Sequence, residues 1–341
     1  MNNFKFLFAI VFLAGAFQGQ AQTLYVDAIN GKNVAQGTAS DPFLSLEKAV
    51  AKANTFRGDN EITIKIARGL YILHNPLKIE NASASANYFI EALVMPDDTA
   101  WRPDKMPVIQ SVAVPDAKAR FKKCVAFDIE RSNVVIRGLK FIGNPSPEAE
   151  YFYAIERHNE KLSNLLISQC YFLGEKTFAP IQGAVFAQGA GIHIDHCIFY
   201  GCKNAALVFL GLKDFSLTHS VIYGAYEAAM WYGYGEGSNT PFTFSNNVVS
   251  NCNYLLVSDK ASEHHYTFSN SVISNNQNYL GFNGMEVEGP DLKNTPIETN
   301  IDKTGSVILN EVTAKGVPVN YLNLAPNSAG YNLNAGIFKK P

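Results

Sequence analysis

Six segments of twelve residues align without gaps through the middle of the chain, and they begin 31, 27, 23, 27 and 24 residues apart. They are Asn133–Asn144, Asn164–Glu175, Gly191–Cys202, Asp214–Ala225, Pro241–Cys252 and His265–Asn276. Their fourth and ninth positions are apolar in every copy. One such copy is too short to bury its apolar side chains alone, so neighbouring copies must stack against one another. The repeat therefore predicts an elongated structure that grows along one axis.

Polar positions of the repeat indicate where the chain turns. The eleventh position is Gly in four copies and Asn in the other two, Asn251 and Asn275. These residue types enter the left-handed region of backbone conformation most easily, so this position predicts a recurring turn. The sixth and seventh positions are mostly amide, His, Cys or Ser, and include Gln169, His196 and His219. Such side chains can form hydrogen bonds from one coil to the next at a shared corner.

A second short strand lies between successive repeats, as in Ala206–Phe209 and Ala229–Tyr232. Two or three strands per period, separated by Gly and Asn corners, predict an all-β fold of the parallel β-solenoid type. Helical periodicity is absent from residues 60 to 285. In Ser45–Asn54, four apolar residues share one face and predict a capping helix. We expect a single domain with an N-terminal cap over residues 22–60, coils over 61–288 and an irregular C-terminal cap over 289–341.

The first 21 residues predict a secretory signal peptide. Lys5 precedes the apolar run from Leu7 to Phe17, and Gly19-Gln-Ala21 provides a small-residue cleavage site. The apolar run is too short to span a bilayer. We therefore expect export to the periplasm or the medium, without insertion into a membrane.

Composition limits the partners and the chemistry. The formal net charge of −2 provides no broad basic surface for nucleic acid. The five cysteines leave at least one thiol unpaired and show no zinc-type spacing. The sequence does not decide whether Cys170 and Cys197, at the same position of adjacent repeats, are bridged, nor the oligomeric state.

The two ends of the chain resemble those of a known group of proteins. The similarity at the start lies in Tyr25-Val-Asp-Ala28, Gly31, Gly37-Thr38, Pro42-Phe43, Leu46, Ala49-Val50, Ile62-Thr-Ile64 and Gly69-Leu-Tyr71, and at the end in residues 324–336. With the repeat between them, the chain resembles right-handed, single-stranded parallel β-helix proteins of the pectate-lyase-like superfamily. That resemblance implies a substrate lying across one exposed sheet face. The superfamily includes polysaccharide lyases, glycoside hydrolases, epimerases, esterases and adhesins.

The resemblance also implies how a lyase of this kind works. Such lyases commonly use a Lys or Arg base, often with Ca²⁺ to neutralise a uronate carboxylate. Lys260 follows a predicted strand, as such a base does. The next coil lacks the Arg-His pair of the chondroitinase- and alginate-lyase-like pattern, and the clustered Asp residues of polygalacturonases are not evident.

The least repeat-like stretch of the core, residues 230–240, is rich in aromatic residues. Trp231, Tyr232 and Tyr234 precede a Gly-rich loop that carries Glu236. Aromatic faces pack well against the C–H groups of sugar rings, so we expect these three residues to bind substrate. Strand alternation predicts that Met230 and Tyr232 point inward and Trp231 outward, although a shift of one residue would reverse this.

A charged segment follows one coil later. Proton abstraction beside a uronate carboxylate needs a base and a cation to stabilise the intermediate. Lys260 with His264 or His265 could supply the base, and Glu236 could act with them. Asp259 and Glu236 could hold Ca²⁺, which prefers oxygen ligands, or could form the carboxylate pair of a glycosidase. A solvated charged turn is the alternative.

Two further clusters are candidates. Arg157, in Glu156-Arg-His158, could bind a substrate carboxylate bidentately, or could form a surface ion pair. His193, Asp195 and His196 suggest a metal site, but strand alternation keeps them from converging, and His196 stacks with His219 instead. The sequence therefore predicts a secreted carbohydrate-active protein, first of all a polysaccharide lyase that cleaves an acidic glycan by β-elimination. The alternatives are a glycoside hydrolase and a non-catalytic glycan-binding β-helix.

Overall fold

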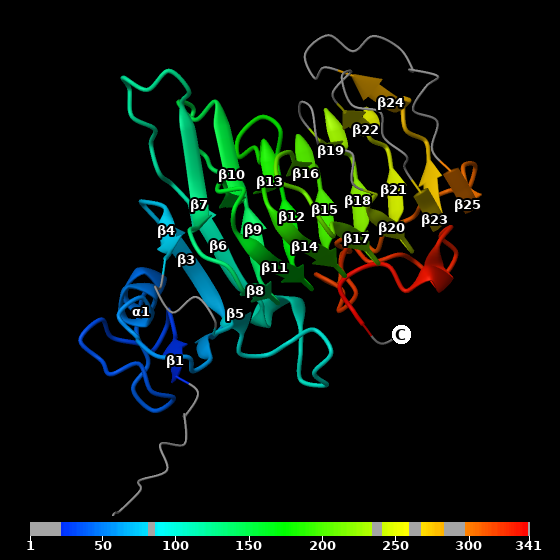
Figure 1. The fold of residues 1–341 in the computed structure, drawn as a ribbon. Coiled ribbons are helices and arrows are strands. Elements are labelled where there is room, and N and C mark those ends of the chain that lie inside the picture. Colours follow the sequence, from blue (N-terminus) through cyan, green and yellow to red (C-terminus); the bar gives the residue numbers. More distant parts are fainter. Residues whose placement is uncertain (1–21, 81–85, 234–240, 259–266, 283–296, 340–341) are drawn as a thin grey trace, which may run out of the picture.

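The computed structural model describes residues 22–80, 86–233, 241–258, 267–282 and 297–339. The chain winds into a right-handed parallel β-solenoid of about eight turns (Figure 1). Every strand pairing between successive coils is parallel. No helix among these residues is long and apolar enough to cross a membrane.

Three faces of parallel strands form the wall of the solenoid. The first contains β1 (Gln22–Val26), β2 (Ile62–Ile66), β5 (Tyr88–Ala92), β8 (Val134–Arg137), β11 (Ser163–Ser168), β14 (Ala190–Asp195), β17 (Ser216–Thr218), β20 (Thr243–Ser245), β23 (Thr267–Ser274) and β25 (Ile297–Asp302). The second contains β3 (Gly69–Leu73), β6 (Pro107–Ser111), β9 (Lys140–Ile142), β12 (Tyr171–Leu173), β15 (Ile198–Tyr200), β18 (Val221–Tyr223), β21 (Val248–Ser250) and the end of β23.

The third face is a separate sheet of eight strands. It contains β4 (Leu77–Ile79), β7 (Lys123–Ile129), β10 (Tyr151–Arg157), β13 (Gly183–Ala187), β16 (Asn204–Val208), β19 (Ala228–Tyr232), β22 (Tyr254–Ser258) and β24 (Asn278–Phe282). The strands expected after successive repeats are six of these, β10, β13, β16, β19, β22 and β24, and the prediction of a parallel solenoid is confirmed.

The apolar positions of the repeat fill the interior. All residues of the fourth and ninth positions are at most 3% exposed. In the ninth position the rings of Phe141, Phe172 and Phe199 stack in sequence, with centroids 5.1 and 4.8 Å apart and planes within 6°. Stacked rings one coil apart bury large apolar areas and hold the register between coils.

The corners of each coil are built from residues with positive φ. The eleventh position adopts this conformation in four copies, from Gly201 to Asn275, which confirms the expected turn there in part. The sixth position adopts it in all six copies, including Gln169, His196 and His219. The sequence placed a corner here but did not predict its left-handed backbone, because residues other than Gly uncommonly take that conformation. The expected hydrogen bonds between coils are present: Ser220 N–H donates to Asn247, and Asn247 N–H donates to Ser271.

The predicted helix is present as α1 (Leu46–Ala53), whose expected apolar face of Leu46, Ala49, Val50 and Ala53 is buried. Ser45 caps its N-terminus by accepting a hydrogen bond from Lys48 N–H. The helix packs against β1, β2 and β4. Among the described residues, the other helical segments are two single turns, η1 (Pro103–Lys105) and η3 (Tyr331–Leu333).

The C-terminal segment does not simply cover the last coil, as the sequence suggested. It runs back along the outside of the second face (red in Figure 1), where Leu322, Leu324 and Ile337 pack on Ile198 and Val221. The eighth position of the repeat, which points outward, is apolar from Tyr171 to Val272, and these side chains are buried under the segment. An exposed apolar stripe of this length needs a cover, and the C-terminal segment provides it.

Candidate functional site

The third face carries a row of outward-pointing side chains that changes from charged to aromatic. In each of its central strands two consecutive residues, such as Ala154 and Ile155, point into the core, and the next residue points outward. The strand register brings the outward residues side by side. This outer row is Lys78, Asp128, Glu156, Phe186, Leu207, Trp231 and Val257.

Two carboxylates lie next to each other at the charged end of the row. Asp128 on β7 is paired in register with Glu156 on β10. Glu156 is 4% exposed, and its oxygens lie 2.7 and 2.9 Å from Nζ of Lys123. Burial, with the charges of Glu130 and Glu156, raises the pKa of Asp128 to about 6, against the opposing effect of Lys78 and Lys123. The row thus holds a half-buried carboxyl group whose pKa is raised, and in register it lies between Lys78 and Glu156.

Aromatic rings continue the site from the carboxylates. Tyr153 stacks on Phe186 with centroids 5.0 Å apart, and Phe186 meets Phe209 edge to face at 5.5 Å. Phe209 in turn lies 6.1 Å from Trp231. Burial and the charge of Glu156 raise the pKa of Tyr153 to about 12, so its hydroxyl stays protonated and can donate a hydrogen bond.

A hollow of about 190 Å³ opens beside this aromatic series. Its lining includes Tyr151, Tyr153, Gln182, Lys203, Asn204, Leu207, Phe209, Glu227 and Trp231. Glu227 accepts a hydrogen bond of 2.6 Å from the Asn204 amide and lies 3.2 Å from Nζ of Lys203. Rings, amides and one paired lysine together suit a sugar with hydroxyl and carboxylate groups.

The predicted aromatic residues separate in the structure. Trp231 points outward and lines the hollow, as strand alternation predicted. Tyr232 is 1% exposed and packs against Phe242 with centroids 4.4 Å apart. The expectation that Tyr232 binds substrate is therefore wrong, because its ring belongs to the core. Tyr234 lies outside the described residues.

Arg157 is also placed differently from the prediction. Its side chain is fully buried, Nε donates to the carbonyl of Gln188 at 2.8 Å, and Nη2 donates to that of Ala190 at 3.0 Å. Burial lowers the pKa of Arg157 to about 10. A guanidinium inside the solenoid cannot bind a substrate carboxylate or form a surface ion pair, so this prediction is wrong. Arg157 instead holds the turn after β13.

The remaining predicted residues cannot be placed. Glu236, Asp259, Lys260, His264 and His265 lie outside the described residues, so both the base and the Ca²⁺ ligands expected there stay predictions. The sequence also missed Asp128. The alternation of acidic and apolar residues in Asp128-Ile-Glu130 could have pointed to Asp128, but only the strand register shows that Glu156 lies beside Asp128.

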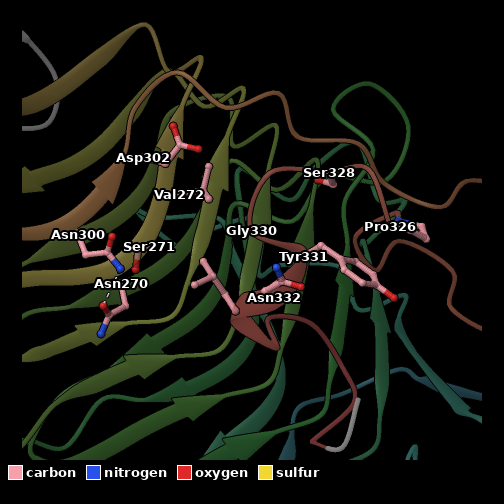
Figure 2. A pocket seen from close by; sticks show the side chains of 11 residues that line it. Asn270, Ser271, Val272, Asn300, Asp302, Pro326, Ser328, Gly330, Tyr331 and Asn332 are labelled. Carbon is pink, nitrogen blue, oxygen red and sulfur yellow. Dashed lines mark hydrogen bonds between the residues drawn. The ribbon is translucent and has the colours of Figure 1, made fainter.

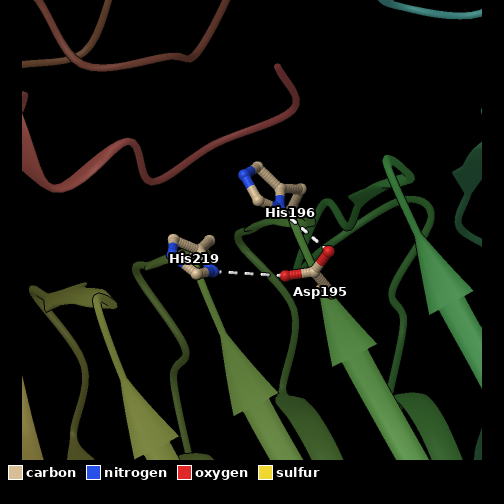
Figure 3. Close-up of side chains that lie close together, drawn as sticks. All are labelled: Asp195, His196 and His219. Carbon is tan, nitrogen blue, oxygen red and sulfur yellow. Dashed lines mark hydrogen bonds and ion pairs between the residues drawn. The ribbon is translucent and has the colours of Figure 1, made fainter. Parts of the chain in front are cut away.

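A second cluster of titratable groups lies at a corner between the first and second faces. The carboxylate of Asp195 lies 2.9 Å from Nδ1 of His196 and 3.3 Å from Nδ1 of His219 (Figure 3). These are the described residues whose ligand atoms come close enough together to consider a metal ion. The two rings are stacked 4.6 Å apart with planes within 12°. In-plane lone pairs of parallel rings do not converge, so both would have to rotate to bind one ion. His193 points elsewhere, to Ser216 at 2.8 Å.

Comparisons with known proteins agree with the fold. Residues 125–273 match the family described as a right handed beta helix region. The chain has the fold of a right-handed parallel β-helix. All five cysteines of this β-helix are buried free thiols, so Cys170 and Cys197 are not bridged.

Three solved structures are similar to the β-helix at low sequence identity. A rhamnogalacturonan lyase is 13% identical, with 93% of this chain and 100% of that chain covered and a TM-score of 0.43. A pectin methylesterase from Aspergillus niger is 12% identical, with 84% and 86% covered and a TM-score of 0.39. XylC, in complex with xylose, is 9% identical, with 89% and 73% covered and a TM-score of 0.41. No curated protein matches in sequence.

Proposed function

We propose that this β-helix is a secreted carbohydrate-active enzyme, a polysaccharide lyase that cleaves an acidic glycan by β-elimination. The observation that carries the proposal is Asp128, a half-buried carboxyl group that lies in register between Lys78 and Glu156 and whose pKa is raised to about 6. The glycan would lie along the outer row, with sugar rings on Phe209 and Trp231.

β-Elimination needs a base that is ionised near neutral pH yet still basic. The raised pKa of Asp128 meets this requirement better than an ordinary exposed carboxylate does. Asp128 would remove the proton beside the uronate carboxylate. Lys78 and Lys123 would stabilise the negative charge that develops there, since cations at that position lower the energy of the transition state. Glu156 would act indirectly, because it is buried, raises the pKa of Asp128 and holds Lys123 in place.

The leaving oxygen must then be protonated. Lys260, His264 and His265 follow β22 in the sequence, and Glu236 follows the neighbouring strand β19. In the sheet, β19 and β22 lie four and five strands from β7, about 20 Å or more from Asp128, so these residues are too far away to donate this proton. We propose that water donates it, and that these residues contact sugar units further along the glycan. We also propose that Glu236 and Asp259 bind Ca²⁺. Measuring the reaction with calcium and with a chelator tests this.

Glycoside hydrolysis is the second candidate, and the pairing of Asp128 with Glu156 favours it. Two adjacent carboxyl groups with different environments can divide the roles of acid and base or nucleophile. Against it, Lys123 covers Glu156, which a sugar would have to reach.

One experiment separates these reactions. The protein is incubated with pectate, alginate, glycosaminoglycans and algal uronate glycans while ultraviolet absorbance and new reducing ends are measured. A lyase produces an unsaturated uronate that absorbs, a hydrolase produces reducing ends alone, and a binding protein produces neither.

The variant Asp128→Asn tests the base. We expect activity to fall by about 10²-fold to 10⁴-fold, the usual contribution of a general base. Asp214→Asn is the matched control, because Asp214 is exposed at a different corner with a φ of 56° that Asn tolerates. Full activity of Asp128→Asn would contradict the assignment.

A further inference from the structure

A polar hollow of about 290 Å³ lies on the far side of the coil from the outer row. The turns and ends of β23 and β25 form one wall, with Asn270, Asn300 and Asp302 (Figure 2). The C-terminal segment forms the other, with Ser328, Tyr331 and Asn332. This hollow has no part in the function proposed above.

The first wall presents amide groups in a fixed arrangement. Asn270 and Asn300 are on neighbouring coils, with φ values of 45° and 55°. Nδ2 of Asn300 donates to Oδ1 of Asn270 at 3.0 Å. That bond uses one half of each amide. Within the described part of the chain, Nδ2 of Asn270 and Oδ1 of Asn300 take no further hydrogen bond, so a donor and an acceptor remain for a ligand.

Asp302 adds a stronger acceptor. Its Oδ1 accepts hydrogen bonds from the backbone N–H groups of Thr304 at 2.9 Å and Gly305 at 2.8 Å. These bonds lower the pKa of Asp302, so the carboxylate is ionised at neutral pH. They engage one oxygen and leave Oδ2 to accept a sugar hydroxyl in a charge-assisted hydrogen bond.

The second wall holds an aromatic ring on a rigid base. Tyr331 is 49% exposed and follows Gly330, which has a φ of 76°. A Cβ at Gly330 would lie 2.7 Å from the Val248 side chain and 3.0 Å from that of Val272, so the backbone there sits directly on the sheet. The backbone next to Tyr331 is therefore held against the sheet, which lowers part of the ordering cost of binding.

Tyr331 also borders a second hollow of about 560 Å³, lined by Asn320, Asn334 and Phe338 among others. Tyr331 thus lines both hollows, as a platform does between adjacent sugar residues. Of the described residues that line these two hollows, Asp302 alone is charged. A carboxylate without a lining cation disfavours an acidic glycan and favours a neutral one.

We propose that the two hollows beside Tyr331 form a second carbohydrate site, which binds a neutral glycan and is separate from the outer row. Sugar C–H groups pack on the Tyr331 ring, and hydroxyls bind to Asn270, Asn300 and Asp302. The site anchors the protein to neutral segments or neighbouring polysaccharides without cleaving them.

Calorimetric titration of the full chain with cello-, xylo-, manno- and galacto-oligosaccharides tests the proposal, with oligogalacturonate as the acidic comparison. We expect at least one neutral series to bind, with affinity reduced tenfold or more in Tyr331→Ala and in Asp302→Asn. Phe178→Ala is the matched control, since Phe178 is a 78% exposed aromatic residue elsewhere on the surface, and it should bind like the wild type.

The same titration with Asp128→Asn separates this site from the proposed catalytic function. Unchanged binding of the neutral glycan by that variant supports an independent site, whether or not the enzyme proves to be a lyase. The proposal is overturned if no neutral series binds, if Tyr331→Ala binds as tightly as the wild type, or if Asp128→Asn abolishes binding. Thermal unfolding of each variant shows that the fold is retained.

Discussion

His196 and His219 stack face to face one coil apart, and the carboxylate of Asp195 lies beside the Nδ1 atoms of both rings. The C-terminal segment docks on this corner. Gly336 N–H donates to the His219 carbonyl, Asn334 reaches Nε2 of His196, and Nζ of Lys339 lies 3.4 Å from Asp195. The corner therefore links the charge state of His219 to the attachment of the segment that covers the second face.

The first prediction is that acid weakens this attachment. Burial and the neighbouring His196 lower the pKa of His219 below its usual 6.5. The unfolded chain then binds a proton more readily than the folded one, so stability falls as the pH drops below about 6.5. Burial raises the pKa of Asp195, but the hydrogen bond and charge of His196 lower it much further, and the stability from that carboxylate is lost at still lower pH.

Urea unfolding and limited proteolysis at pH 7.5 and 5.5 measure this effect. We expect a lower unfolding midpoint at pH 5.5 and faster cleavage within residues 303–339. In His219→Asn the difference between the two pH values should shrink, since Asn tolerates the φ of 47° at this position and does not titrate. An equal difference in variant and wild type would show that other groups control the acid response.

Much of the fold was predictable because the apolar positions of the repeat are the residues that fill the core. The fourth position of the repeat, from Ile136 in the first copy to Phe268 in the last, is always apolar because each residue stacks on its counterpart in the next coil. The left-handed turn at His196 and His219 was not predictable, because it is imposed by the stacking of coils against the residue's own preference. The path of the C-terminal segment was also hidden, since its apolar residues do not repeat.

The second prediction concerns two glycines at the eleventh position of the repeat. Gly143→Ala should destabilise the protein more than Gly224→Ala. A Cβ at Gly143 would lie 1.7 Å from the carbonyl oxygen of Ala179, whereas at Gly224 the nearest atom is 3.9 Å away. The cost at Gly224 is then the backbone strain of a φ of 70°, about 1–2 kcal/mol. Chemical denaturation measures both, and equal losses would argue against the close packing at Gly143.

The third prediction concerns the stacked phenylalanines of the interior. Phe172→Ala removes the middle ring of the series from Phe141 to Phe199 and leaves a cavity. We expect a loss of about 3–5 kcal/mol in the free energy of unfolding. Phe178→Ala, at an exposed position, should change it by less than about 0.5 kcal/mol. Similar losses in both variants would mean that the stack contributes little.

The candidate site was harder to predict than the fold. Strand alternation predicted correctly that Trp231 faces outward and Tyr232 inward. Arg157 and Tyr232 were misassigned because their residue types suit a sugar, whereas both side chains are buried. Asp128 and Glu156 are 28 residues apart in the sequence, and only the pairing of β7 with β10 makes them neighbours.

The last prediction is that Asp128→Asn stabilises the protein while removing its activity. A carboxyl group whose pKa rises to about 6 on folding favours the neutral form, so its contribution to stability is present below about pH 4 and is lost as the pH rises towards 6. At pH 7 the folded state holds an ionised carboxylate at a cost. Because Asp128 is half-exposed, solvent screening reduces that cost to about 1 kcal/mol. Asn should recover most of it, and urea unfolding of wild type and variant at pH 4 and pH 7 measures the difference.

The pH–rate profile completes this test. If Asp128 is the base, activity should rise with pH, and the midpoint of this rising limb should lie near pH 6. Glu130→Gln removes a charge that raises this pKa, so the limb should move to lower pH without loss of the maximal rate. A merely structural carboxylate would lose stability when replaced by Asn and would leave the limb in place in Glu130→Gln. Higher stability, lost activity and a shifted limb together would identify Asp128 as a group held at an energetic cost for catalysis.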